Sequence, residues 1–279
     1  MSDIDATRKR VRLARAGGAI VAFVPTMGAL HAGHGALIDT ARAKADFVVV
    51  SVFVNPDQFG DGEDFERYPR PFACDAAYCE SLGVDLLFHP EKAMITAPSR
   101  TLSLAESQLS RGLCGASRPG HFSGVLSIVS TLFNIVEPDV AVFGQKDAQQ
   151  VRLIQALVKD LCYGIEIVVE PIVREPDGLA MSSRNVYLSD DERKQSLCLS
   201  QSLEHVRGHF EAGERDTAVL QRELLNGLQD ASSISVEYAE IVDYATLEAA
   251  KTICAKTLAA VAVRIGTTRL IDNVLLDCV

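Results

Sequence analysis

Length, composition and charge set the first limits on this chain. It has 279 residues, of which 48% are hydrophobic and 23% charged, enough for a sizeable apolar core in one large domain or two smaller ones. The formal net charge of −10 argues against a nucleic-acid-binding surface, which needs a basic patch. A small anionic substrate stays compatible with this charge, because a few local cations and backbone N–H groups decide such a site.

Cysteine usage and the N-terminal segment indicate the compartment. The seven cysteines form no C-x-x-C pair, which argues against a disulfide framework or a cysteine-type zinc site and favours reduced thiols. The first 18 residues lack the apolar region of a signal peptide, and no run approaches the roughly 20 apolar residues of a membrane span. We therefore expect a cytoplasmic protein with neither nucleic-acid nor membrane partners.

The first 60 residues predict the start of an α/β sheet. A short basic helix over residues 5–16 ends at Gly17-Gly18, and the apolar run 19–24 predicts a buried strand. A helical pattern follows over 35–45. The near-continuous apolar run 45–56 is rich in β-branched residues, which is typical of a strand covered on both faces in a parallel sheet.

The alternation of strands and helices continues to about residue 170. The pattern predicts helices over 74–82, 123–136 and 145–161, strands over 84–90, 139–144 and 165–173, a polar loop over 61–72, and an irregular excursion covering the site over 91–120. This order indicates an α/β fold with a doubly wound parallel sheet.

After residue 175 the pattern changes. Ser189 and Glu192 fit a capping box that opens a long helix to about residue 210, and a second helix is expected over 216–228. Three strand-like runs follow, over 234–243, 258–266 and 268–276. We therefore predict two domains, residues 1–175 with the parallel sheet and residues 176–279 as a smaller α+β domain.

Two histidines lie in the turn between the first strand and the next helix. The segment 24–37 reads VPTMGALHAGHGAL, with His31 and His34 separated by Ala32 and Gly33. The N-terminus of a helix attracts phosphate through its N–H groups and its dipole, and imidazoles there can donate further hydrogen bonds. Simple capping of the helix by the two histidines is the alternative explanation.

Two further segments carry groups suited to phosphate. FGQKDAQQ (143–150) follows a strand and places Lys146 four residues before Gln150. LAMSSRN (179–185) combines two hydroxyls with Arg184, which can grip a triphosphate. The alternatives are a solvated helix face and an ordinary interdomain linker. RPGHF (118–122) adds an Arg and a His, or is a surface loop.

Other patterns point to structure rather than chemistry. His205 and His209 have the spacing of a metal-binding pair on one helix face, but the glutamate of a metalloprotease motif is missing and Gly208 weakens the helix, so a solvated face is expected. His89 before Pro90 is expected in a structural turn. The sequence has no G-x-x-x-x-G-K-[ST] loop and no G-x-S-x-G elbow.

The motifs taken together resemble the pantothenate synthetase (pantoate–β-alanine ligase) family. The resemblance rests on VPTMGALHAGHGAL, FVNPDQF, EDFERYPR, ASRPGHFSGV, FGQKDAQQ, DGLAMSSRNVYL and RLIDN, an ordered set that spans residues 23 to 273. The H-x-G-H turn alone marks only a nucleotidyltransferase-like superfamily. The family's fold is a Rossmann-like ATP domain with a smaller C-terminal lid, and its members are usually dimeric.

The resemblance implies a two-step reaction. ATP and (R)-pantoate give pantoyl adenylate and pyrophosphate, and the amine of β-alanine then displaces AMP to form (R)-pantothenate, with Mg²⁺ accompanying ATP. We therefore expect these three small molecules as substrates, Mg²⁺ as cofactor and a homodimer. The alternatives are a nucleotidyltransferase that keeps the nucleotide in its product and a catalytically inactive binding protein.

The resemblance also assigns residues. His34 would be the proton donor and, with His31, Lys146 and Arg184, would form the catalytic set. Gln58 and Gln150 would bind pantoate, Gln58 would also lie near β-alanine, and Asp75 resembles an acidic position near the metal, with Cys74 in place of an acidic residue beside it. The ATP site would comprise Met27, Gly28, Ala29, Leu30, His31, Ala32, Gly33, His34, Gly144, Gln145, Lys146, Asp147, Val173, Met181, Ser182, Ser183 and Arg184.

Three further departures from the family pattern accompany these assignments, besides Cys74. Gln145 stands where Glu is frequent and Ala148 where an aromatic residue is frequent. The usual Met-Tyr-Pro segment is missing near residues 94–98, so the flap over the site is expected to differ.

Overall fold

The computed structural model describes residues 1–96, 101–229 and 234–278, which form two compact units. The predicted division at residues 175/176 differs from this grouping, since residues 107–117 and 146–149 pack with the second unit. The first unit comprises Met1–Glu106, Arg118–Gln145 and Gln150–Pro171, and the second comprises Ser107–Ser117, Lys146–Gln149 and Ile172–Val279.

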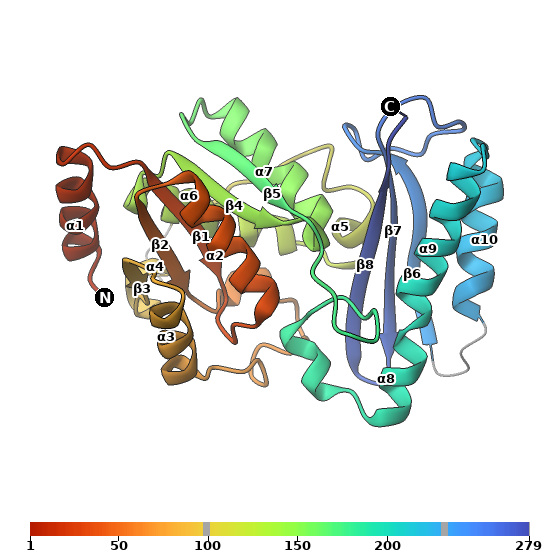
Figure 1. Ribbon diagram of the computed structural model, residues 1–279, viewed down its shortest axis with the longest axis horizontal. Helices are drawn as coiled ribbons and strands as arrows, with labels where there is room; N and C mark the ends of the chain where they lie inside the picture. The colour runs from red at the N-terminus through yellow and green to blue at the C-terminus, as the bar shows by residue number, and fades with distance from the viewer. Residues whose placement is uncertain (97–100, 230–233, 279) are drawn as a thin grey trace. The chain divides into compact units, whose positions relative to one another are not determined.

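Five parallel strands form the sheet of the first unit, in the order β3-β2-β1-β4-β5 (Figure 1). This order confirms the predicted doubly wound parallel sheet. Strand order reverses between β1 and β4, and ligands of such folds bind at that position, beyond the carboxyl ends of the strands. The strands are β1 (Val21–Thr26), β2 (Phe47–Val52), β3 (Leu86–Phe88), β4 (Val140–Gly144) and β5 (Glu166–Glu170).

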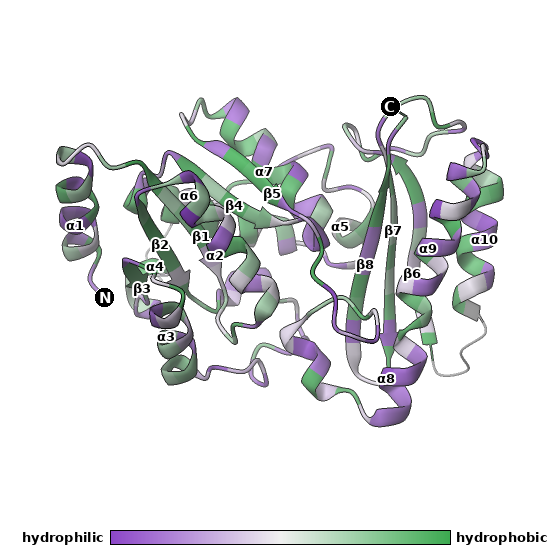
Figure 2. Cartoon of the chain, in the orientation of Figure 1, coloured by the Kyte–Doolittle hydropathy of each residue, from purple (hydrophilic) through white to green (hydrophobic). Residues whose placement is uncertain are grey.

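Helices cover both faces of this sheet, because successive residues of a strand point to opposite sides. Ala22 of β1 packs in one cluster with Ile38 of α2 and Cys79 of α3. Phe23, the next residue, meets Phe133 of α6 edge-on, with ring centroids 6.4 Å apart. Figure 2 shows β1 and β2 in the green of apolar residues, as expected for strands buried on both sides. The helices are α1 (Ile4–Ala16), α2 (Ala32–Lys44), α3 (Phe72–Ser81), α4 (Lys92–Ile95), α6 (His121–Val136) and α7 (Ala148–Asp160).

Several predicted boundaries shift by a few residues at helix starts. Helix α2 begins at Ala32 rather than residue 35, because His31 caps it. The predicted helix over 145–161 begins as the short 3₁₀ turn η2 (Gln145–Asp147) before α7, and the turn after β2 contains another, η1 (Pro56–Gln58). Within the irregular excursion 91–120, the described residues contain α4 and α5 (Leu113–Ser117), while residues 97–100 lie outside the described part.

The second unit confirms the small α+β prediction. Its antiparallel sheet has the order β6-β7-β8.

The prediction of a single long helix from residue 189 is wrong. The capping box of Ser189 and Glu192 is present, but the helix divides at Leu197, where the Ser196 hydroxyl donates to the Arg193 carbonyl and competes with the regular helix bonds. The elements are η3 (Ser183–Tyr187), α8 (Asp190–Ser196), α9 (Cys198–Glu211), α10 (Thr217–Gln229), β6 (Ile234–Asp243), β7 (Thr257–Ile265) and β8 (Thr268–Leu276).

The core of the second unit lies between its sheet and two helices. Leu203 and Val206 of α9 and Leu224 of α10 are at most 1% exposed and pack in one cluster with Val261 and Val263 of β7. Rigid packing of this kind fixes the two helices against each other. Among the helices that the structure describes, none is both long enough and apolar enough for a membrane span.

Candidate active site

The predicted site residues of the first unit follow neighbouring parallel strands. The histidine turn comes after β1, Gln58 comes after β2, and Gly144 is the last residue of β4. Since β1 pairs with both β2 and β4, these three positions share the carboxyl edge of the sheet. They therefore flank the reversal of strand order, where a ligand is expected.

The Asp75 carboxylate holds the turn that follows β1. It projects from α3, is 2% exposed, and accepts hydrogen bonds from the backbone N–H of Ala29 at 3.0 Å and of Leu30 at 2.8 Å. Gly28 adopts φ +85°, and a Cβ there would lie 2.8 Å from Val52 and 2.9 Å from the Asp75 carboxylate. The turn thus needs glycine both for its backbone conformation and for its close approach to Asp75.

His31 and His34 cap the helix that they begin. Nδ1 of His31 accepts the N–H of Gly33 at 3.1 Å, and Nδ1 of His34 accepts the N–H of His31 at 3.3 Å. The pair forms a reciprocal capping box in which imidazoles replace the usual hydroxyl and carboxylate. Helix capping by the two histidines is therefore present, and the N–H groups of His31 and Gly33 are satisfied by the imidazoles.

The same contacts define what the two rings can offer. A nitrogen that accepts a backbone N–H carries no proton, so each neutral ring bears its proton on Nε2. The rings lie 4.1 Å apart between centroids, at 42° to each other. Capping therefore orients both imidazoles through Nδ1.

The Gln58 side chain connects the turns after β1 and β2. Its Nε2 donates to the sulfur of Met27 at 2.8 Å, and its Oε1 accepts from Asn55 at 3.4 Å. Asn55 also donates to the Gly124 carbonyl of α6 at 3.2 Å. A Cβ on Gly124 would lie 2.2 Å from the Asp57 carbonyl oxygen, so α6 approaches this turn as closely as a backbone allows.

A partly buried ion pair holds the backbone at Gln58. Arg118 donates to Glu63 at 2.6 Å and to the Gln58 carbonyl at 3.2 Å, and Nδ1 of His121 lies 2.7 Å from that carbonyl. Burial raises the pKa of Glu63, but the hydrogen bonds and charge of Arg118 outweigh it and hold that pKa below its ordinary value. The RPGHF segment thus fixes the turn that carries Gln58.

Lys146 belongs to the second unit and is anchored by β8. Asn273 donates through Nδ2 to the Lys146 carbonyl at 3.0 Å. Burial lowers the pKa of the Lys146 ammonium, and the positive charge of Arg184 lowers it further against the opposing charges of Asp147 and Asp272. The positive charges of Lys146 and Arg184 would together attract an anion.

The segment after β5 forms a small hairpin in the second unit. The Met181 N–H donates to the Val173 carbonyl at 3.0 Å, which brings together two predicted parts of the ATP site. Ser182 caps η3 by accepting the Arg184 N–H at 3.2 Å. Arg174 donates to both oxygens of Asp272, at 2.6 and 3.1 Å, and ties the hairpin to β8. The loop 179–185 is thus a braced element and not an open linker.

Comparison with known proteins decides the family. A family model described as pantoate-beta-alanine ligase matches residues 1–275. The chain belongs to the pantoate–β-alanine ligase family.

Relatives and solved structures agree with this family along nearly the whole chain. Pantothenate synthetase of Thermotoga neapolitana is 51% identical over 256 residues, 92% of this chain and 91% of that protein. The crystal structure of pantothenate synthetase from Thermus thermophilus has a TM-score of 0.93 and 40% identity, covering 100% of this chain and 99% of its own. That of pantoate-beta-alanine ligase from Francisella tularensis, complexed with beta-gamma ATP and beta-alanine, has a TM-score of 0.80 and 33% identity, covering 99% and 96%.

Sequence reasoning missed several residues that position the ligase site. Asp75 was expected near a metal, whereas its observed contacts hold the turn after β1. Asn55 and Asn273 received no role, although each had a signal, since Asn55 lies three residues before Gln58 and Asn273 ends the RLIDN motif. Gln150 lies in the first turn of α7, in the first unit, whereas Lys146 belongs to the second.

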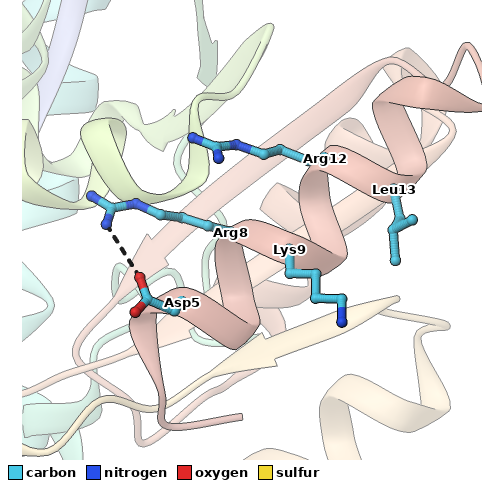
Figure 3. A pocket seen from close by; sticks show the side chains of 5 residues that line it. All are labelled: Asp5, Arg8, Lys9, Arg12 and Leu13. Atoms are coloured by element: carbon cyan, nitrogen blue, oxygen red, sulfur yellow. Dashed lines mark ion pairs between the residues drawn. The ribbon is translucent and has the colours of Figure 1, made fainter.

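A surface hollow elsewhere on the first unit contains none of the predicted ligase residues. It has a volume of about 360 Å³ and is lined by residues of α1 alone (Figure 3). Arg8 in its wall pairs with Asp5 at 3.7 Å, and Arg12 pairs with Glu137 at 3.6 Å. Exposed pairs of this kind contribute little, so we interpret this face as solvated surface.

Proposed function

We propose that this chain condenses (R)-pantoate with β-alanine to (R)-pantothenate, using ATP and releasing AMP and pyrophosphate. The family match over residues 1–275 supports this reaction, as does the relative solved with beta-gamma ATP and beta-alanine. The structural observation that supports it is the position of two segments with groups suited to phosphate. The oriented histidines follow β1 and the segment Gly144–Gln145 ends β4 and follows it, on either side of the reversal of strand order.

Adenylation explains why such groups are needed. A carboxylate is a poor acyl donor, because an amine would have to expel an oxide from it. In the first step a pantoate carboxylate oxygen attacks the α-phosphorus of ATP and the bond to pyrophosphate breaks. In the second step the nitrogen of β-alanine attacks the acyl carbon, the bond to the AMP oxygen breaks, and the nitrogen loses a proton. Positioning and charge neutralisation supply most of the acceleration of such transfers.

The residues of this chain divide these tasks. His31 and His34 would donate Nε2–H to phosphate oxygens as negative charge moves to pyrophosphate, and Lys146 and Arg184 would supply positive charge. Since capping keeps Nδ1 as an acceptor, we propose that His34 acts as a hydrogen-bond donor that keeps its proton. Gln58 and Gln150 would bind the hydroxyls and carboxylate of pantoate. The remaining ATP contacts are proposed for Met27, Gly28, Ala29, Leu30, Ala32, Gly33, Gly144, Gln145, Asp147, Val173, Met181, Ser182 and Ser183.

Mg²⁺ remains part of the proposal as a companion of ATP. Asp75 does not fit as its ligand, since it is buried and both carboxylate oxygens already accept backbone N–H groups. Mg²⁺ commonly keeps several waters and binds through substrate phosphates, which suits a site with few protein ligands. We also propose a homodimer in the cytoplasm, which the resemblance to the family supports and light scattering of the purified chain would test.

A product assay tests the reaction. Enzyme, Mg²⁺, ATP and pantoate are mixed with and without β-alanine. The ligase predicts that AMP and pyrophosphate rise in step with pantothenate. Release of ADP, or a stable nucleotide-linked product in the presence of β-alanine, would contradict the ligase, and the second result would favour a nucleotidyltransferase. Absence of any turnover would favour a binding protein.

A further inference from the structure

The seam between α9 and α10 carries a cluster of three side chains outside the proposed active site. His205 and His209 lie one turn apart on α9, and their Nε2 atoms are 3.1 Å apart. Glu223 of α10 faces them, with its Oε2 3.9 Å from Nε2 of His205. One ligand atom from each residue lies within 4.8 Å of the other two, and among the described residues this is the group of histidine, cysteine and acidic side chains that could hold a metal ion.

The distances fit a metal ion of tetrahedral preference. Two nitrogens bound to zinc at about 2.0–2.1 Å in a tetrahedral arrangement lie about 3.3 Å apart, close to the observed separation. The carboxylate oxygen is slightly too far and would close by rotation of the Glu223 side chain, which is 27% exposed. The competing pair between Glu223 and Arg222, at 3.7 Å with Arg222 64% exposed, is weak and easily exchanged.

The core beneath the cluster makes this arrangement rigid. Two of the three ligands stand next to a fully buried residue, since Val206 follows His205 and Leu224 follows Glu223. Both belong to the cluster that packs α9 and α10 on the sheet, where the two helices lie side by side (Figure 1). Ligands on packed helices keep their spacing better than ligands on loops.

We propose that His205, His209 and Glu223 form a binding site for a divalent transition-metal ion that clamps α9 to α10. Two imidazoles select zinc, nickel or copper, whereas magnesium prefers an all-oxygen set. Three protein ligands leave a fourth position for water. None of the three residues has a part in the proposed ligase reaction, so this site and the ligase activity stand or fall separately.

Metal titration of the full chain tests the site. Zn²⁺ alone, without ATP, is titrated calorimetrically into the wild type and into His205→Ala, His209→Ala and Glu223→Gln, and thermal unfolding is recorded with and without Zn²⁺. We expect the wild type to bind one ion more than either histidine variant, or to bind it at least about 100-fold more tightly, since even outer-shell changes cost 10–100-fold. Glu223→Gln should lose about tenfold, because an amide oxygen is a weaker ligand.

Matched variants distinguish metal binding at this site from metal binding by cysteines or by histidines elsewhere in the chain. Arg222→Ala removes the competing cation and should bind Zn²⁺ as well as or better than the wild type. The double variant His31→Ala/His34→Ala should keep the ion that His205→Ala loses. With Co²⁺ in place of Zn²⁺, the wild type should show the absorption spectrum of a low-coordinate ion. The His205→Ala and His209→Ala variants should not show it. Equal stoichiometry and affinity in the wild type and in the His205→Ala/His209→Ala double variant would overturn the proposal, as would equal binding of Mg²⁺.

Discussion

Two histidine pairs in one chain are put to different uses. In the turn after β1, His31 and His34 point Nδ1 back at the helix start and accept backbone N–H groups. On the face of α9, His205 and His209 point Nε2 at each other. The first pair is thereby oriented by the helix that it caps. The second brings two nitrogens within 3.1 Å of each other, a spacing that a chelated metal ion could bridge.

The difference comes from the position of each pair in its helix. The first turn of a helix has N–H groups without helical acceptors, so a nearby imidazole is drawn into capping them. In the middle of a helix every N–H is already bonded, and residues four apart face each other above the surface. The sequence separation, three residues in one pair and four in the other, does not by itself predict which pair caps a helix and which pair lies on its face.

The substitution with the largest expected effect removes one of the two capping histidines. His34→Ala eliminates a donor to phosphate and one half of the capping box, so pantoyl adenylate formation should fall by about 100–1,000-fold, as on loss of an oxyanion donor. Single-turnover formation of the adenylate measures it. His209→Ala is the matched control from the other pair and should form adenylate at the wild-type rate. If both variants kept that rate, the assignment of His34 would be wrong.

Lys146 is proposed as a charged hydrogen-bond donor to phosphate, in contrast to the imidazoles of His31 and His34. Lys146→Ala should slow adenylation by about 10–150-fold, the equivalent of about 1.5–3 kcal/mol for a hydrogen bond to a charged group. Because burial lowers the pKa of Lys146, the ammonium loses its proton at lower pH than an ordinary lysine. Adenylation should therefore decline as pH rises through that lowered pKa.

The pH profile of single-turnover adenylation checks this assignment. Lys146→Arg keeps its charge to higher pH, so the alkaline decline should move upward even if the rate at neutral pH is lower. An alkaline decline at the same pH in Lys146→Arg would show that another group causes it.

The third effect acts on the support of the histidine turn. Asp75→Asn replaces one acceptor oxygen with an amide NH₂ that faces a backbone N–H of Ala29 or Leu30. We expect a loss of about 1–3 kcal/mol in the free energy of unfolding, and a fall of about tenfold in adenylation at saturating ATP, since the turn loses its fixed position. Denaturant unfolding and single-turnover kinetics measure the two. Loss of Mg²⁺ dependence alone, with stability unchanged, would instead favour a metal role for Asp75.

The sequence predicted the sheet, both domains' fold classes and most elements, because apolar runs and helical periods are local properties of the chain. It also placed the histidine turn at the end of a strand. It could not show the partners of Asp75, which lies 45 residues from Leu30, nor those of Asn273, 127 residues from Lys146. The expected solvated face of α9 agrees with the exposure of His205 and His209, but the sequence could not show that Glu223, from another helix, lies beside them.

The smallest expected effect concerns Glu63, which pairs with Arg118 beside His121 at the turn that carries Gln58. Because the pKa of Glu63 is lowered from its ordinary value of 4.5, the folded state binds its proton less readily than the unfolded state. The stabilisation is therefore complete above about pH 4.5 and is lost as pH falls through the lowered pKa.

Glu63→Gln should reduce the free energy of unfolding at neutral pH by about 1 kcal/mol and flatten its acid-side slope. Urea unfolding between neutral and acid pH measures both, with Glu166→Gln, from the exposed pair with Lys44, as a control that leaves the slope nearly unchanged. Parallel slopes in the wild type and Glu63→Gln would mean that Arg118 holds the turn without help from the Glu63 charge.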